Sequence, residues 1–160
     1  GPDAPSIASV DLVARFLSGT LRAVPSGGLS FVDVRDVAVG IAEALEHGRP
    51  GERYLLSSAN MTFAEFFDRL ARIEGRKAPG LRLPRGAHRL LGFLPESVSS
   101  KLPGASDLEP QEVEMASHYW YADASKARNE LAWQPRDPGS TLDDTVRDLR
   151  GRGLQLLSGA

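Results

Sequence analysis

Cysteine is absent from the 160 residues. The chain therefore has no disulfides, no thiolate ligands for zinc and no cysteine nucleophile, an absence that fits the reducing cytoplasm. Neither sign of charge is in excess, because 19 Lys and Arg stand against 21 Asp and Glu, for a formal net charge of -2. Nucleic acids and anionic membranes favour basic proteins, so neither is expected as a partner.

Long hydrophobic runs are missing as well. Runs such as residues 54–56 are far shorter than a membrane-spanning helix, and the N-terminus lacks the charged start and apolar core of a secretory signal. With 41% hydrophobic and 25% charged residues, the composition is that of a folded globular domain. We therefore expect one cytoplasmic domain with a hydrophobic core of its own.

The motifs that bind phosphate groups or transfer protons are not found. None of the 16 glycines has the GxGxxG or GxxGxxG spacing that brings a pyrophosphate to the N–H groups of a strand-to-helix turn. None of the three tyrosines is followed by lysine four positions later, and no GxxxxGK[ST] loop is present. The chain therefore offers no cofactor-binding residues that we can name.

Metal and nucleophile motifs are missing too. His47, His88 and His118 are too scattered to indicate a metal site, and none belongs to an HExxH pattern. No GxSxG elbow marks a catalytic serine. We predict neither a metal ligand nor a catalytic residue in this chain.

Apolar spacing and capping residues predict the helices. Residues 6–19 place apolar side chains on one helical face, with Ser6 as a cap and Gly19 as the stop. Thr62 and Glu65 have capping-box spacing, which predicts a helix from Phe63 to Gly75. Further helices are predicted over residues 85–94, 110–119, 124–131 and from 140 or 141 onward, and residues 95–110 are predicted to form a surface loop.

A charged corner lies between a predicted strand, residues 29–34, and a predicted helix that ends at Gly48. Asp36 is interpreted as the cap of this helix, and its inner face is predicted to hold Val37, Ile41, Ala44 and Leu45. Arg35 could contact a substrate carboxylate or phosphate, but we favour its pairing with Asp33 or Asp36.

The predicted strands are too few for a central sheet. Besides residues 29–34, only residues 53–56 and 81–84 have strand patterns, against about six helices. A strand as apolar as residues 53–56 normally joins a larger parallel sheet that is covered on both faces. We therefore expect the rest of that sheet to lie outside this chain.

Four aromatic residues allow two interpretations. They could form a stacking platform for an aromatic substrate or a base, or they could pack in the core, which we favour. They are Tyr119, Trp120, Tyr121 and Trp133.

Four stretches in order carry a resemblance to a known family: GPDAPS at 1–6, SFVDVRDVAVGIAEALEHGRPGERYLLSSANMTFAEFF at 30–67, LRLP at 81–84 and YWYADASKARNELAWQPR at 119–136. They resemble the C-terminal half of an extended short-chain dehydrogenase/reductase, in the dihydroflavonol-4-reductase-like branch of the NAD-dependent epimerase/dehydratase family. The resemblance implies an α/β fold, mostly helical with a few short strands, that lacks the N-terminal Rossmann core. Residues 1–153 would form the substrate-binding half, and residues 154–160 a tail.

The resemblance also implies a function. Such a half would serve an NAD(P)-dependent reductase or epimerase, in which the Rossmann half supplies NAD or NADP and a Tyr/Lys acid-base pair for hydride transfer. This chain alone would then bind no cofactor and be inactive. The alternative is a non-catalytic module, derived from that family, for ligand binding or protein assembly. Relatives that act on nucleotide sugars carry an Arg-Asp pair where residues 26–28 are Ser-Gly-Gly, which favours a less charged substrate.

Substrate-binding positions follow from the same resemblance. The helix start places Ser6, Ile7 and Val10 toward a small-molecule substrate, although capping by Ser6 and core packing by the other two are equally compatible with the pattern. Asp33 and Arg35 are the candidates at the charged corner. The implied partner is the missing Rossmann half, or a second copy associating through an exposed apolar face.

Overall fold

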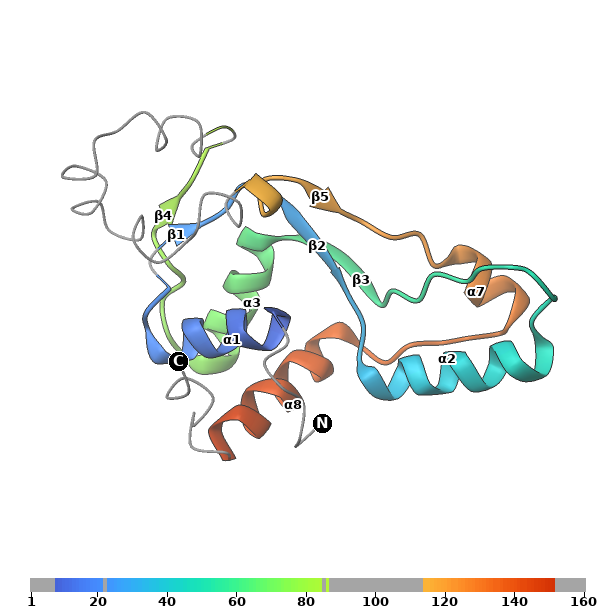
Figure 1. Cartoon of the computed structure of the whole chain (residues 1–160). Helices are drawn as coiled ribbons and strands as arrows, with labels where there is room; N and C mark the ends of the chain where they lie inside the picture. The colour runs from blue at the N-terminus through green and yellow to red at the C-terminus, as the bar shows by residue number, and fades with distance from the viewer. Residues whose placement is uncertain (1–7, 22, 85, 87–113, 152–160) are drawn as a thin grey trace.

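The structure is a computed structural model, and it describes residues 8–21, 23–84, 86 and 114–151. These residues form an α/β fold in which helices predominate and the strands are short (Figure 1). In chain order the elements are α1 (Ala8–Ser18), β1 (Ala23–Val24), β2 (Gly28–Phe31), α2 (Val34–His47), β3 (Ala59–Thr62), α3 (Phe63–Glu74), β4 (Leu81–Arg82), β5 (Tyr119–Trp120), α7 (Ser125–Glu130) and α8 (Pro138–Gly151). No helix in the described part of the chain is long and apolar enough to cross a membrane.

The strands form two small sheets. In the three-stranded sheet, β2 lies between β3, which is antiparallel to it, and β5, which is parallel to it. Leu29 on β2 stands opposite Met61 on one side and Trp120 on the other. β1 and β4 form a separate parallel pair. The sheet therefore joins segments that are about 90 positions apart in the sequence.

The larger hydrophobic cluster lies among α1, α3 and α8, at one end of the molecule (Figure 1). Phe16 on α1 meets Phe67 on α3 with ring centroids 5.7 Å apart, and Leu149 on α8 is buried against the same cluster. Tight packing of buried aromatic and aliphatic side chains supplies most of the stability of such a domain.

The smaller hydrophobic cluster lies between α2 and α7, at the other end (Figure 1). Its buried members are Ala124, Ala127, Leu131 and Trp133, and Tyr54, Leu56 and Ala44 pack against them. Trp133 is among the largest fully buried side chains of the described residues. The smaller cluster therefore holds α2 against α7 and the segments that contain Leu56 and Trp133.

The predicted capping box is confirmed. The Thr62 hydroxyl accepts a hydrogen bond from the Glu65 N–H at 3.1 Å, and the Glu65 carboxylate accepts one from the Thr62 N–H at 2.8 Å. Gly75 ends α3 with a left-handed φ of 63°. Gly19 likewise follows α1 with a φ of 77°, as its predicted stop. The predicted cap Ser6 lies outside the described residues.

The prediction for α2 is wrong in its start and in half of its inner face, because Val37 is half-buried and Ala44 packs against the smaller hydrophobic cluster, as predicted. The cap is Asp33, and Asp36 lies buried inside the first turn. α2 buries Asp36 and Gly40, whereas Ile41 and Leu45, predicted as inner residues, are exposed. The physical reason is close packing: a Cβ on Gly40 would lie 2.6 Å from the Leu56 Cδ1, so the helix approaches this segment through its smallest residue.

Two strand predictions are corrected. The strand at residues 29–34 is shorter, because Asp33 already caps α2, and β2 covers Gly28–Phe31. Residues 53–56 form no strand, since no described segment pairs with them. The strand predicted at residues 81–84 is the short β4.

The later helices begin near their predicted positions. α7 covers Ser125–Glu130, where residues 124–131 were expected. α8 begins at Pro138, two residues before the predicted start, and the Asp137 carboxylate accepts a hydrogen bond from the Ser140 N–H. The helix predicted over residues 110–119 is wrong at its end, because Tyr119 belongs to β5 and pairs with Gly28. The predictions for residues 87–113, and for the tail from 154 to 160, lie outside the described residues.

Candidate functional site

Asp33 and Arg35 form a bidentate ion pair at the start of α2. The Arg35 Nε donates to the Asp33 Oδ1 at 2.9 Å, and Nη2 donates to Oδ2 at 2.6 Å. The backbone N–H of Arg35 also donates to Oδ1, which makes Asp33 the helix cap. Asp33 is buried, so this pairing satisfies a carboxylate that has little access to water. The predicted pairing of Arg35 with Asp33 is confirmed.

Arg35 also connects α2 to α8. Its Nη2 donates to the Asp144 Oδ2 at 2.6 Å, so one guanidinium joins two carboxylates from different helices. The hydrogen bond from Arg35 lowers the pKa of Asp33 to about 2, and a hydrogen bond from the same guanidinium lowers the pKa of Asp144. Both carboxylates are therefore ionised at neutral pH.

Asp36 is the second buried carboxylate of the corner. It accepts hydrogen bonds at 2.9 Å from both the backbone N–H and the Nε of Arg136, 100 positions away. The Nε of Arg136 also lies 3.7 Å from the Asp33 Oδ2. Because every carboxylate oxygen of Asp33 and Asp36 has a donor, neither is placed as a free general base.

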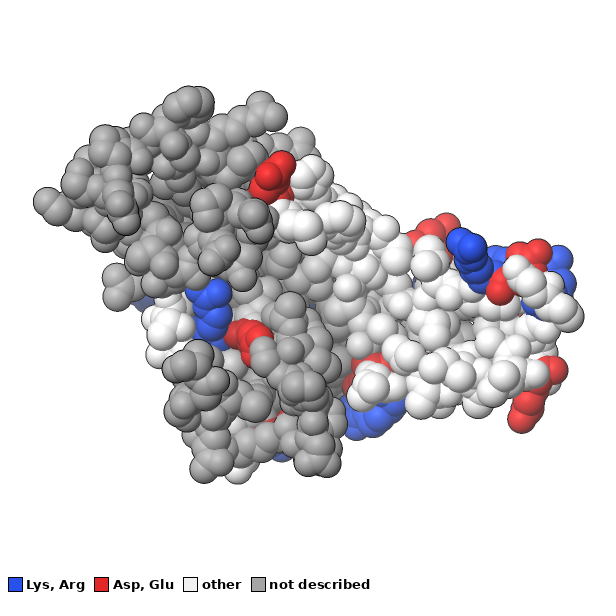
Figure 2. Space-filling view, viewed as in Figure 1, with Lys and Arg blue, Asp and Glu red and all other residues white. Residues whose placement is uncertain are grey.

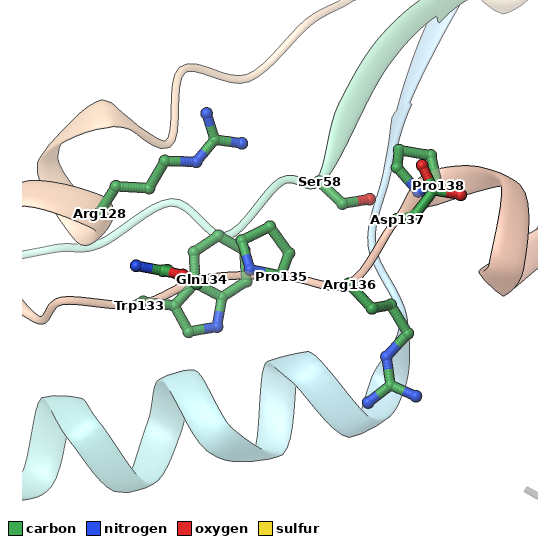
Figure 3. Close-up of a pocket in the computed structure, with 8 residues that line it drawn as sticks. All are labelled: Ser58, Arg128, Trp133, Gln134, Pro135, Arg136, Asp137 and Pro138. Atoms are coloured by element: carbon green, nitrogen blue, oxygen red, sulfur yellow. The ribbon is translucent and has the colours of Figure 1, made fainter.

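An open cleft adjoins this corner (Figure 3). Its volume is about 450 Å³, and it is lined by Ser58, Arg128, Trp133, Gln134, Pro135, Arg136, Asp137 and Pro138. Figure 3 shows the Arg136 guanidinium turned toward α2, and Arg128 approaching from α7. Arg128 donates to the Ser57 carbonyl at 3.2 Å, and the Ser58 hydroxyl donates to the Phe31 carbonyl at 2.8 Å. The side chains of Arg128, Ser58 and Arg136 are thus occupied in holding segments together.

Of the predicted substrate-binding residues, the structure describes Val10, Asp33 and Arg35. Asp33 and Arg35 lie together at the corner. Val10 is half-buried on α1 and packs against the larger hydrophobic cluster. Ser6 and Ile7 lie outside the described residues. A substrate role for these five residues stays a prediction.

The aromatic residues divide into two groups. Core packing is correct for Trp133, which is buried, and wrong for Tyr119, Trp120 and Tyr121, which are about half-exposed. The Tyr119 and Tyr121 rings meet edge to face with centroids 5.4 Å apart. Partial burial raises the pKa of Tyr121, and the charge of Glu65 acts in the same direction. The edge position of β5 explains the exposure, because no described strand covers its outer side.

The described residues do not fit a nicotinamide dinucleotide. A pyrophosphate needs free N–H groups at a helix N-terminus, beside glycines that allow close approach. Here the first turns of four helices already donate to oxygens of this chain, from Asp33 at α2, Thr62 at α3, Asp123 at α7 and Asp137 at α8. Nor do the described ranges contain a cluster of His, Asp and Glu that could hold a metal ion.

The sequence gives little sign of the contacts that organise this corner. Arg136 and Asp144 lie about 100 residues beyond their partners, and no local pattern marks the pairing. The stretch WQPR at residues 133–136 carries the family resemblance, and it is the one signal that could have pointed to Trp133 and Arg136.

Comparison with family models finds no match for the chain. Among curated proteins, it is 29% identical over 147 residues to a protein of Synechocystis sp. named "Putative dihydroflavonol 4-reductase"; the match covers 89% of this chain and 43% of that protein.

Solved structures also match most of this chain and less than half of their own length. The crystal structure of gox2253 matches with a TM-score of 0.72 and 28% identity, over 92% of this chain and 45% of that one. PA4631, a nucleoside-diphosphate-sugar epimerase from Pseudomonas aeruginosa, matches with a TM-score of 0.71 and 26% identity, over 94% of this chain and 44% of that one. RMD from Pseudomonas aeruginosa, complexed with NADPH, matches in fold alone, with a TM-score of 0.54 and 16% identity, over 91% of this chain and 41% of that one.

The chain therefore spans less than half the length of the relatives that it matches. The matches confirm the α/β fold with few short strands, and they confirm the resemblance to dihydroflavonol-4-reductase-like and epimerase proteins.

Proposed function

We propose that this chain, a relative of dihydroflavonol-4-reductase-like and epimerase proteins, is the substrate-binding part of an NAD(P)-dependent reductase or epimerase of the cytoplasm. One observation carries the proposal: about nine-tenths of the chain matches less than half of each relative. A longer polypeptide of the relatives' size would have room for a second part of at least equal length.

The reactive centre is assigned to that second part. One N–H group in the first turn of each of α2, α3, α7 and α8 donates to a side-chain oxygen of this chain, and the sequence has no glycine motif for a dinucleotide. One structural relative is complexed with NADPH. We assign NAD or NADP, and the Tyr/Lys pair that transfers the proton, to the part outside this chain.

The residues of this chain bind and orient the substrate in this proposal. Ser6, Ile7 and Val10 are assigned to contact the substrate. Asp33 fixes the direction of α2 through its cap, and Arg35 holds α2 to α8. The Arg35 side chain is half-exposed, and its Nη1 makes none of the described hydrogen bonds. That group can donate to an anionic oxygen of a substrate without breaking either ion pair.

The backbone around residues 26–28 favours a substrate without a diphosphate. A Cβ on Gly27 would lie 2.2 Å from the His118 carbonyl, and one on Gly28 would lie 2.7 Å from the Tyr121 ring. Neither position has room for the arginine that grips a diphosphate in nucleotide-sugar relatives. Reduction of a less charged carbonyl compound is therefore the favoured reaction within the proposal.

A turnover assay tests this function. The longest polypeptide encoded in the natural reading frame that contains these residues is purified, and NADH and NADPH binding is followed by fluorescence. Turnover is measured with a panel of ketones and aldehydes that includes a dihydroflavonol, and in parallel with nucleoside-diphosphate sugars. We expect turnover of a carbonyl compound by the longer polypeptide and no cofactor binding by the 160-residue chain. Tight cofactor binding by the short chain would overturn the proposal.

The alternative is a ligand-binding or assembly module without catalysis. It is favoured by the exposed apolar side chains of α2, which indicate a partner surface. The same purified polypeptide separates the two functions, because a module would bind its partner or ligand with no turnover of any carbonyl compound or sugar nucleotide.

A further inference from the structure

Two tyrosines lie on one face of the three-stranded sheet. The rings of Tyr119 and Tyr121 meet with centroids 5.4 Å apart, so both side chains lie on the same face of β5. Gly28, which pairs with Tyr119, lies on this face of β2, whereas Leu29 packs on the other face against the larger hydrophobic cluster. The tyrosine face of the sheet is therefore turned away from that cluster.

Gly28 makes room for the Tyr121 ring. A Cβ on Gly28 would lie 2.7 Å from the Tyr121 Cε1, so the ring occupies the space that a side chain on β2 would take. Tyr119 and Tyr121 are nevertheless 42% and 47% exposed. Because their ring planes stand 75° apart, the pair offers solvent two aromatic surfaces at nearly a right angle.

The segments that form this sheet carry acidic residues and no basic ones. These segments are residues 26–32, 56–65 and 114–125. They contain neither Lys nor Arg, and their acidic residues are Glu65, Glu114 and Asp123. In Figure 2 the visible surface over β5 has no basic side chain, and an acidic side chain lies beside the start of the strand. The sheet therefore suits a positively charged ligand better than a negatively charged one.

Glu65 is the carboxylate that acts on the tyrosine face. Hydrogen bonds from the backbone N–H and the hydroxyl of Thr62 lower the pKa of Glu65, with a smaller effect of Arg69 in the same direction, so Glu65 is ionised at neutral pH. Both hydrogen bonds end on the Glu65 Oε2, and Oε1 makes none of the described ones. Burial raises the pKa of Tyr121, and the Glu65 charge adds to this effect. A cation on the Tyr121 ring would therefore gain from the carboxylate as well as from the ring.

We propose that Tyr119 and Tyr121 bind the ammonium group of a small alkylammonium compound, with Glu65 as the counter-charge. Aromatic ring faces attract cations, and alkylated ammonium groups are the ones that aromatic side chains recognise in proteins. A nucleic-acid base, which the sequence also allows on these rings, carries phosphates that the acidic segments repel.

The ligand is small because few groups remain to recognise more of it. The Asn60 side chain is paired with Ala122, and the Thr62 hydroxyl with Glu65. Recognition therefore depends on the two rings and one charge, which a compact cation satisfies.

This site is separate from the charged corner at α2. Gly28 begins β2 and Asp33 follows its end, which places them roughly 15 Å apart at about 3.3 Å per residue. Binding at the tyrosines needs neither a cofactor nor a second part of a longer polypeptide. Failure of this proposal would leave the proposed function standing, and the reverse also holds.

An NMR titration of the 160-residue chain tests the proposal. The probes are choline and its neutral carbon analogue, in which a tert-butyl group replaces the trimethylammonium group. We expect choline to shift the amide signals of residues 119–121 with a Kd of about 10 mM, and the analogue to bind at least about 10-fold more weakly. Equal binding of the two probes, or no shift at these amides, would overturn the proposal. A trimethyllysine peptide that binds more than about 10-fold more tightly than choline would also overturn it, in favour of a protein partner.

Ring substitutions test which side chains hold the cation. Tyr121→Phe keeps the ring and should leave the Kd of choline within about twofold, whereas Tyr121→Leu should raise it at least about fivefold. Tyr119→Phe and Tyr119→Leu should behave in the same way, which guards against a folding defect at Tyr121. Trp120→Leu, on the other face of β5, should leave the Kd unchanged. A larger loss in Trp120→Leu than in either tyrosine variant would contradict the assignment.

A matched pair of charge substitutions tests Glu65. Glu65→Gln removes the charge, and its amide oxygen still accepts the capping hydrogen bond from the Thr62 N–H. It should raise the Kd of choline about threefold at low salt, whereas Glu46→Gln, at an exposed carboxylate of α2, should not change it. Equal Kd values for Glu65→Gln and the unaltered chain would show that Glu65 is not the counter-charge.

Discussion

The indole N–H of Trp133 donates a hydrogen bond to the backbone carbonyl of Asp36, 2.8 Å away, in the interior between α2 and the segment that follows α7. This bond joins residues 97 positions apart, and Trp133 is almost completely buried. A buried indole N–H needs such a partner, because leaving it unpaired costs about 1–3 kcal/mol. The bond thereby fixes both the depth and the rotation of α2.

Trp133→Phe should lower the free energy of unfolding by about 1–2 kcal/mol, because it removes the donor and part of the buried ring. Urea denaturation measures the change. The matched control is Trp120→Phe, at an exposed tryptophan, which should change the free energy by no more than about 0.5 kcal/mol. Equal losses in the two variants would show that the burial of Trp133 does not stabilise the fold.

The free energy of unfolding should fall in acid because the Asp33 carboxylate becomes protonated. Its pKa of about 2 in the folded chain lies below the value of about 3.9 expected when unfolded. The stabilisation is therefore complete above about pH 5 and is lost as the pH falls toward 2. Solvent around the half-exposed Arg35 weakens the pair, so we expect a loss of about 1–2 kcal/mol.

The measurement is the free energy of unfolding at pH 6, 4 and 3. In Asp33→Asn this pH dependence should flatten, whereas Asp144→Asn, at an exposed carboxylate of the same network, should flatten it less. An Asp33→Asn chain that loses as much stability as the unaltered chain would contradict the assignment.

Gly40→Ala should destabilise the chain although alanine favours helices. The added Cβ would lie 2.6 Å from the Leu56 Cδ1 and 3.1 Å from the Trp133 Nε1, in the interior of the smaller hydrophobic cluster. Overpacking of this kind costs about 1–3 kcal/mol. This exceeds the roughly 1 kcal/mol gained from the higher helix propensity of alanine over glycine. Thermal melting shows the sign.

The control for this prediction is Gly80→Ala, where an added Cβ meets nothing within 4 Å. It should be neutral or slightly stabilising, because alanine lowers the conformational entropy of the unfolded chain. A stabilising Gly40→Ala would mean that α2 is not held closely against Leu56.

The stability of the fold should depend on the amide group of the Asn60 side chain. It donates to the Ala122 carbonyl at 3.0 Å and accepts from the Ala122 N–H at 3.1 Å, so it joins β3 to the segment after β5. Asn60→Asp places a carboxylate oxygen against the carbonyl and should cost about 1 kcal/mol in this exposed setting. Asn129→Asp, on the exposed surface of α7, should change stability by less than about 0.5 kcal/mol under the same conditions.

The sequence could predict the elements that local contacts determine. The capping box of Thr62 and Glu65 lies within four residues, and the Asp33–Arg35 pair spans only two positions. These features follow from the chain near them, so their spacing is sufficient evidence.

The sequence could not predict features that depend on distant segments. Hydrophobic periodicity assigned Ile41 and Leu45 to the inner face of α2, but Arg136 and Trp133 set its rotation from about 100 positions away. Residues 53–56 have the composition of a strand, yet a strand also requires a neighbour, and no described segment provides one. For the same reason the link between Arg35 and Asp144 has no local signal.

Asp33 stands at the point where the chain leaves the sheet and enters α2, and its carboxylate holds both Arg35 and the first turn. One small side chain at the start of α2 therefore sets the direction of the helix axis. A tilt of a few degrees there would displace Leu45, eleven residues along, by several times the shift at Val34. A new binding surface around Leu45 can therefore evolve through a substitution at Asp33, with no change in the residues of that surface.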